Sequence, residues 1–112
     1  MKAGRQGGSR ITLVHTPRTE FLGDTVARSF IMIMPVGLMG LADVLDRRGH
    51  EVEILHLGLR RMRTPRFDLG AHVAERRAQL VGFTLQWHHQ LYNVLREAMA
   101  VKAAAPEASV VL

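Results

Sequence analysis

Three histidines are the side chains of this sequence whose chemistry stands out first. His15 follows the apolar run Ile11–Val14, and His88 and His89 follow the apolar run Leu80–Leu85. Imidazole nitrogens are common metal ligands, so the three could in principle share an ion. His88 and His89 would lie about 100° apart on a helix, however, and no carboxylate joins them at ligand spacing. We therefore expect no metal ion bound by protein ligands.

Nucleophilic catalysis is not indicated by the sequence either. No serine stands in a recognised motif with an acid and a histidine; the serines are Ser9, Ser29 and Ser109. The sequence contains no cysteine, which excludes a thiolate zinc site, a cysteine-ligated iron–sulfur cluster and a disulfide made by these residues. We therefore expect no catalytic residues here, and the composition fits a reducing cytoplasm.

Strands alternating with helices must position any site that these residues form. Apolar runs predict strands at Ile11–Val14, Val52–Leu57, Leu80–Leu85 and Ser109–Leu112, and helices are expected from Pro35 to the cap at Gly49, over about Phe67–Ala78 and over about His89–Ala104. Gly58–Pro65 is interpreted as a basic loop. This alternation predicts an α/β fold, a flavodoxin-like (Rossmann-like) parallel sheet with helices on both faces.

The apolar periodicity of the helices predicts which side chains are buried. The first helix should bury Leu38, Leu41, Ala42 and Leu45, and the last should bury Leu91, Val94, Leu95, Ala98 and Val101. Gly82 is expected to allow a close approach within the third strand. Residues 1–9 are expected to be a flexible lead, with a domain over residues 10–112.

A ligand of an open parallel sheet binds outside the carboxyl ends of the strands. That rule selects Thr16 and Pro17 after the first strand, Leu57–Arg61 after the second and Thr84–His89 after the third. Trp87, the only tryptophan, could stack on a ligand or cap the core. The apolar residues Met32, Ile33 and Met34 could line a ligand or belong to the core.

The net charge of +5 and a cluster of arginines raise the question of an anionic partner. The cluster comprises Arg47, Arg48, Arg60, Arg61, Arg63 and Arg66, with Arg76 and Arg77 further on. Aromatic residues interleaved for base stacking are missing, so nucleic-acid binding is not favoured over a solvated basic face. No apolar run approaches the roughly 20 residues of a membrane span. We therefore expect a soluble cytoplasmic protein without a membrane partner.

Four segments taken together resemble a known family. They are Pro35–Ala42, Arg48–Ile54, Leu80–Thr84 and Lys102–Leu112, and their order and spacing resemble those of the N-terminal cobalamin-binding domain of cobalamin-dependent radical S-adenosylmethionine enzymes. The resemblance implies a flavodoxin-like sheet that binds cobalamin at the carboxyl ends of its strands. It also implies a following barrel domain that holds the iron–sulfur cluster and S-adenosylmethionine, absent from this sequence. The last strand–loop–helix elements of the binding domain are expected to be missing too.

The rule for strand ends and the resemblance together select the cofactor-binding residues, which we expect to be Thr16, Pro17, Gly37, Thr84, Leu85, Gln86, Trp87 and His88. Thr84 matches the hydroxyl of the family's Ser-x-Leu pattern, which can bond the benzimidazole end of the cofactor, whereas Gln86 departs from the expected leucine. Gly37 and Gly40 could approach the corrin ring, although helix–sheet packing is the favoured explanation. No Asp-x-His-x-x-Gly motif follows the first strand, so no axial histidine is expected from it.

Three other functions remain open from the sequence. A nucleotide-binding domain of the same fold is weakened because no Gly-x-Gly-x-x-Gly follows the first strand and no Walker loop exists. A phosphate-receiving regulator is weaker still, because it needs clustered carboxylates after the first strand and an aspartate ending the third. The last alternative is a non-catalytic domain that docks on a partner through Val110–Leu112, since an open strand edge invites strand addition.

Overall fold

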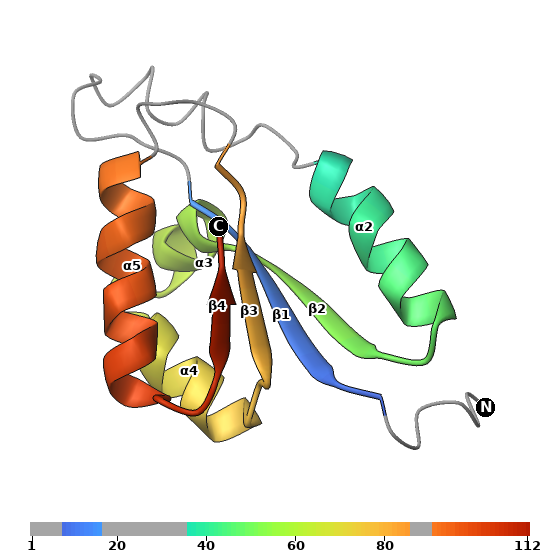
Figure 1. Cartoon of the computed structure of the whole chain (residues 1–112). Helices are drawn as coiled ribbons and strands as arrows, with labels where there is room; N and C mark the ends of the chain where they lie inside the picture. The colour runs from blue at the N-terminus through green and yellow to red at the C-terminus, as the bar shows by residue number, and fades with distance from the viewer. Residues whose placement is uncertain (1–7, 17–35, 86–90) are drawn as a thin grey trace.

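The computed structural model describes residues 8–16, 36–85 and 91–112. Its centre is a four-stranded parallel sheet in the order β2-β1-β3-β4 (Figure 1). The strands are β1 (Arg10–His15), β2 (Glu51–His56), β3 (Leu80–Phe83) and β4 (Ser109–Val111). β2 lies on one side of β1, whereas β3 and β4 lie on the other side. This strand order is consistent with a flavodoxin-like α/β fold. The predicted fold class is confirmed.

Helices cover both faces of this sheet. α2 (Val36–Arg47) lies on one face, mainly over β2, while α3 (Leu57–Arg63), α4 (Leu69–Arg76) and α5 (Leu91–Ala104) lie on the other (Figure 1). The arrangement follows from right-handed crossovers, because a connection that leads from β2 over β1 to β3 must pass on the face opposite to α2. No helix among the described residues has the length and apolarity needed to cross a bilayer.

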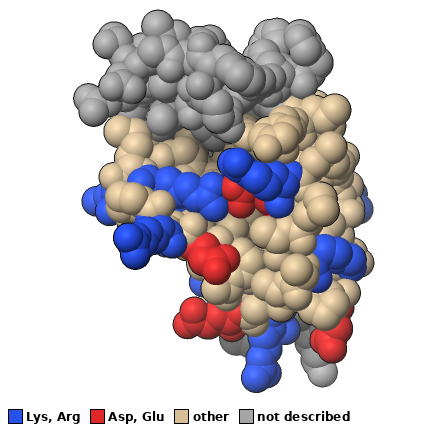
Figure 2. All heavy atoms as spheres, turned by 90° about the vertical axis from the view of Figure 1, so that its left-hand side faces the viewer, with Lys and Arg blue, Asp and Glu red and all other residues tan. Residues whose placement is uncertain are grey.

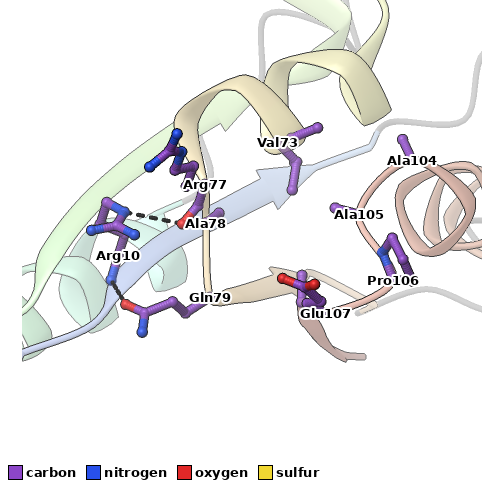
Figure 3. Close-up of a pocket in the computed structure, with 11 residues that line it drawn as sticks. Arg10, Val73, Arg77, Ala78, Gln79, Ala104, Ala105, Pro106 and Glu107 are labelled. Atoms are coloured by element: carbon purple, nitrogen blue, oxygen red, sulfur yellow. Dashed lines mark hydrogen bonds between the residues drawn. The ribbon is translucent and has the colours of Figure 1, made fainter.

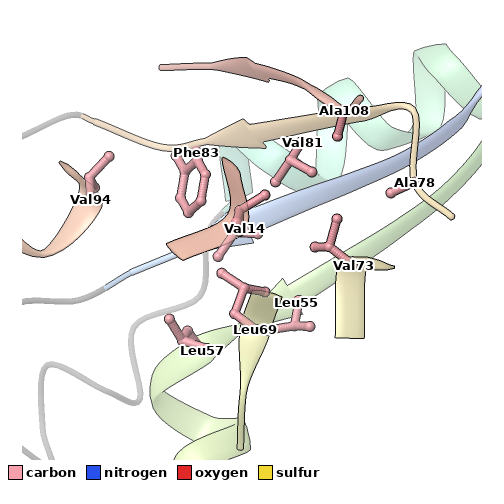
Figure 4. Close-up of a cluster of buried hydrophobic side chains, with 11 residues drawn as sticks. Val14, Leu55, Leu57, Leu69, Val73, Ala78, Val81, Phe83, Val94 and Ala108 are labelled. Atoms are coloured by element: carbon pink, nitrogen blue, oxygen red, sulfur yellow. The ribbon is translucent and has the colours of Figure 1, made fainter. Parts of the chain in front are cut away.

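The larger of two apolar clusters lies between the sheet and the helices α3, α4 and α5 (Figure 4). Its fully buried members include Val14, Leu57, Leu69, Val73, Val81, Val94 and Val101. The smaller cluster joins Ile11 and Leu13 of β1 to Leu38 of α2. β1 is therefore buried on both faces, as expected for the inner strand of a parallel sheet.

The segment after β2 differs from the prediction. The sequence was interpreted as a strand to Leu57 and a basic loop at Gly58–Pro65, but β2 ends at His56 and the next seven residues form α3. The side chain of His56 caps this helix by accepting a hydrogen bond from the Leu59 N–H at 3.2 Å. Leu57 then turns into the core, where it is buried. The cap and the burial of Leu57 together favour a helix in this segment. Its many arginines had led to the interpretation as a loop.

The helices bury a narrower stripe than their periodicity predicts. Val94 and Val101 are buried as expected and Ala98 is partly buried, but Leu91 and Leu95 are each 43% exposed. In α2 likewise Leu38 is buried while Leu41 is exposed. A peripheral helix on a sheet buries only the residues along one line. The side chains at the two edges of its apolar face therefore remain exposed to solvent.

Two glycines matter for packing, and one of them was expected. A Cβ atom at Gly82 would lie 3.1 Å from Leu13 Cδ2, which agrees with the close approach predicted in β3. A Cβ atom at Gly70 of α4 would lie 2.9 Å from Ala100 O of α5, and this close helix contact was not foreseen. Gly40 has no atom within 4 Å of such a Cβ, so helix–sheet packing does not explain its presence. Gly49 has φ 90°, as expected of a left-handed helix cap.

Candidate functional site

The carboxyl ends of β1 and β3 meet through a pair of polar side chains. Val14 pairs with Phe83, so the next residues, His15 and Thr84, stand side by side beyond the ladder. His15 Nδ1 lies 3.1 Å from Thr84 Oγ1, and the Thr84 N–H donates to Val14 O at 3.1 Å. This is the junction between neighbouring strands at which open α/β sheets bind ligands.

His56 brings the end of β2 to the same junction. The register pairs His15 with His56, and their ring centroids lie 4.7 Å apart with the planes at 69°. His56 Nδ1 accepts the Leu59 N–H at 3.2 Å, which fixes the orientation of the His56 ring beside His15. Two imidazoles and one hydroxyl thus form a cluster, which we call the rim cluster: His15, His56 and Thr84.

His15 and Thr84 act in the rim cluster as neutral hydrogen-bonding groups. His15 is only 7% exposed, and burial followed by repulsion from His56 lowers its pKa from 6.5 to about 4. His15 is therefore neutral at neutral pH. Thr84 Oγ1 donates to Val14 O at 3.5 Å, which lets it accept from His15 Nδ1–H and leaves His15 Nε2 as an acceptor.

The other residues predicted for this site are only partly described. Thr16 is buried next to His15, and Leu85 follows Thr84 and is 39% exposed. Gly37 is exposed in the first turn of α2. The remaining predicted residues lie outside the described part of the chain: Pro17, Gln86, Trp87 and His88, together with Met32, Ile33, Met34 and His89.

Two expectations for the strand ends need correction. Leu57 is a core residue rather than a site residue, because it is 1% exposed inside the larger cluster. Arg61 is also occupied, since its guanidinium forms a bidentate pair with Glu97 of α5 at 2.5 and 3.1 Å and its Nε donates to Phe67 O. This pair fastens α3, the helix that His56 caps, to α5.

Sequence reasoning missed His56, although a signal was present. β1 and β2 both end in an apolar residue followed by histidine, Val14-His15 and Leu55-His56, at paired positions of the register. The prediction grouped His15 with His88 and His89 after the third strand, whereas the register of β1 with β2 pairs His15 with His56. Within residues 8–16, 36–85 and 91–112, no group of three His, Cys, Asp or Glu side chains could hold a metal ion.

On the face that carries α5, the described basic residues do not form one continuous surface. Figure 2 looks on to the face that carries α5 and shows basic side chains separated by acidic and uncharged ones. Several arginines have partners: Arg76 with Glu53 at 3.3 Å, Arg47 with Asp43 at 3.1 Å and Arg60 over the Phe67 ring.

A groove of about 540 Å³ lies at the opposite, amino edge of the sheet (Figure 3). Its walls come from the end of α4 and the turn after α5, including Arg77, Ala105 and Pro106. Arg10 Nε donates to Arg77 O at 3.0 Å, and the Arg10 N–H donates to Gln79 Oε1 at 2.9 Å. The prediction had placed the ligand site at the other edge, so this groove was not foreseen.

Comparisons with protein-family models, curated proteins and solved structures found no match to this chain. The sheet order defines the class, an α/β domain with a parallel sheet, and the function has to be argued from the rim cluster itself.

Proposed function

We propose that this chain is a corrinoid-binding module that holds cobalamin for a radical S-adenosylmethionine domain or partner chain. The observation that carries the proposal is the meeting of His15, His56 and Thr84 at the carboxyl edge of three neighbouring parallel strands. This edge is where sheets of this order bind ligands. The segments that resemble the cobalamin-binding family include β3 and the Thr84 that follows it, which belongs to the rim cluster.

The chemistry of the rim suits a large neutral guest. Cobalamin carries neutral amide groups around its macrocycle, and such groups pair with hydroxyls and neutral imidazoles. The described rim supplies the Thr84 hydroxyl, the neutral ring of His15 and the apolar side chain of Leu85. A site with a few polar groups beside apolar ones is typical of cofactor binding. Thr16, Thr84, Leu85 and Gly37 are the described residues that would hold the cofactor.

The bound cofactor would supply methyl-transfer or electron chemistry, and the chain's own residues would bind and orient it. Thr84 Oγ1 would accept a hydrogen bond from an amide N–H at the edge of the ligand, because its own proton is donated to Val14 O. His15 is a positioning residue, because its Nδ1 holds the Thr84 hydroxyl in place. Since His15 is neutral, it adds no charge that would oppose burial of the ligand.

Titration with hydroxocobalamin tests this function. We expect a saturable change in the cobalamin absorbance and co-elution of the pigment with the protein in gel filtration. Thr84→Val should weaken binding up to about tenfold, the worth of one hydrogen bond, whereas Thr84→Ser should retain it. Thr64→Val makes the same change at an exposed position after α3 and serves as the control.

Absence of co-elution would contradict the proposal, provided that circular dichroism shows a folded protein. Equal affinities of Thr84→Val and Thr84→Ser would contradict the role of the hydroxyl while leaving cobalamin binding itself intact.

A further inference from the structure

The groove at the amino edge of the sheet brings together two arginines from distant parts of the chain. Arg10 begins β1 and Arg77 follows α4, and both line the groove (Figure 3). Arg10 Nε donates to Arg77 O, so the Nη1 and Nη2 groups of Arg10 remain available. Neither arginine has an acidic partner among the described residues. Both guanidinium groups can therefore bind an anion in the groove.

Gln79 adds a neutral donor beside these arginines. Its Oε1 accepts the Arg10 N–H at 2.9 Å, which orients the side-chain amide and leaves the NH₂ group of Gln79 as a donor. Gln79 lines the same groove. Arginine forks bind carboxylates through two parallel hydrogen bonds, and an amide NH₂ group can donate to the same oxygens. The three side chains thus form a set of donors suited to a carboxylate.

The backbone of Arg77 has a conformation that glycine favours. Arg77 has φ 55° and ψ 43°, and it is the only described residue other than glycine with a positive φ. The Arg77 N–H donates to Ala74 O and the Ala78 N–H to Val73 O, the two hydrogen bonds that end α4. A side chain at this left-handed position costs stability. An arginine there indicates a role for its side chain that offsets this cost.

The balance of charge around the groove favours a ligand with one negative charge. The carboxyl ends of α4 and α5 lie at this edge and carry partial negative charge, and Glu107 adds a full one. Lys102 donates to the backbone after α5 and offsets the end of that helix. Together with Arg10 and Arg77, these groups leave about one positive charge.

We propose that this groove binds a small organic carboxylate, whose charged group pairs with Arg10 and Arg77. Its apolar body would lie against the apolar residues of the groove, which include Val73, Ala78, Ala105 and Pro106. The groove volume of about 540 Å³ lies within the range of small-molecule sites. The groove and the rim cluster lie at opposite edges of the sheet, so this inference is independent of cobalamin binding.

Titration of the full chain with benzoate, followed by NMR of the backbone amides, tests this site. Benzoate should shift the signals of Ala78, Gln79 and Ala105 along a saturable curve. Benzamide has the same shape without the charge, and acetate has the charge without the apolar body. Each of these two compounds should bind about tenfold more weakly than benzoate, or weaker still.

Arg77→Asn separates the role of the side chain from that of the backbone. Asparagine tolerates the left-handed conformation, so this variant should melt at the temperature of the parent or up to about 4 °C higher. It should bind benzoate about tenfold more weakly, because one guanidinium is lost. Arg66→Asn makes the same change at an exposed arginine outside the groove and should bind benzoate like the parent.

Four outcomes would overturn the proposal. The first is a folded protein whose groove signals benzoate does not shift. The second is equal benzoate affinity of Arg77→Asn and Arg66→Asn. The third is benzamide or acetate that binds as tightly as benzoate. The fourth is phenyl phosphate that binds more tightly than benzoate, which would assign the groove to a doubly charged ligand. Loss of cobalamin binding with intact benzoate binding would reject only the proposed function.

Discussion

Acidification should destabilise the protein through His15. The pKa of this buried imidazole is about 4 in the folded state against 6.5 as its ordinary value. The unfolded chain therefore binds more protons between these two values, and stability falls as the pH falls from about 6.5 towards 4. The full difference corresponds to about 3 kcal/mol, and about 2 kcal/mol of it is lost by pH 5. Above about pH 6.5 this contribution is fully present.

Urea unfolding followed by circular dichroism at pH 7.5 and pH 5 measures this loss. His15→Gln keeps a neutral polar side chain but cannot take up a proton, so its stability should fall by about 2 kcal/mol less than that of the parent over this range. Comparing the two pH dependences cancels the other titrating groups. His50→Gln makes the same change at the amino edge, where His50 Nδ1 accepts the Ser9 N–H, and serves as the matched control outside the rim cluster.

Parallel pH profiles for His15→Gln and the parent protein would refute the reasoning. They would mean that His15 takes up its proton without cost, through a rearrangement that relieves its burial or its contact with His56.

Two further predictions concern the contacts that hold the helices together. Gly70→Ala should lower the free energy of unfolding by about 1–2 kcal/mol because the new methyl group meets Ala100 O. Gly40→Ala has free space around it and should be neutral or stabilising by up to about 1 kcal/mol. Equal effects of the two variants in thermal unfolding would contradict the close contact at Gly70. Arg61→Met should lower the free energy of unfolding by about 2–3 kcal/mol, because it leaves Glu97, only 8% exposed, without its bidentate partner. Arg63→Met changes an exposed arginine of the same helix and is the control in urea unfolding. A cost below about 0.5 kcal/mol at Arg61 would show that Glu97 finds water or another donor.

The rim cluster joins residues that are far apart in the sequence. His15 and Thr84 are separated by 69 positions, yet the register of β1 and β3 sets them side by side. The same register joins His15 to His56 of β2. A parallel sheet thus builds a site from residues that are single and unremarkable in their own segments.

The sequence by itself determined the architecture of this protein. The apolar runs located all four strands to within two residues at either end, and Gly49 marked the end of α2. These features are local, because strand burial and left-handed caps depend on neighbouring residues. The alternation of strands and helices then allowed few sheet orders, since crossovers are right-handed.

Only the tertiary structure decided how the strand ends are used. The pairing of His15 with Thr84 depends on the register, and the sequence gives no local sign of register between strands so far apart. The helix at Leu57–Arg63 depends on the burial of Leu57 and on the Arg61–Glu97 pair, both contacts with distant residues. The pKa of His15 likewise follows from burial and from His56, which are properties of the folded chain.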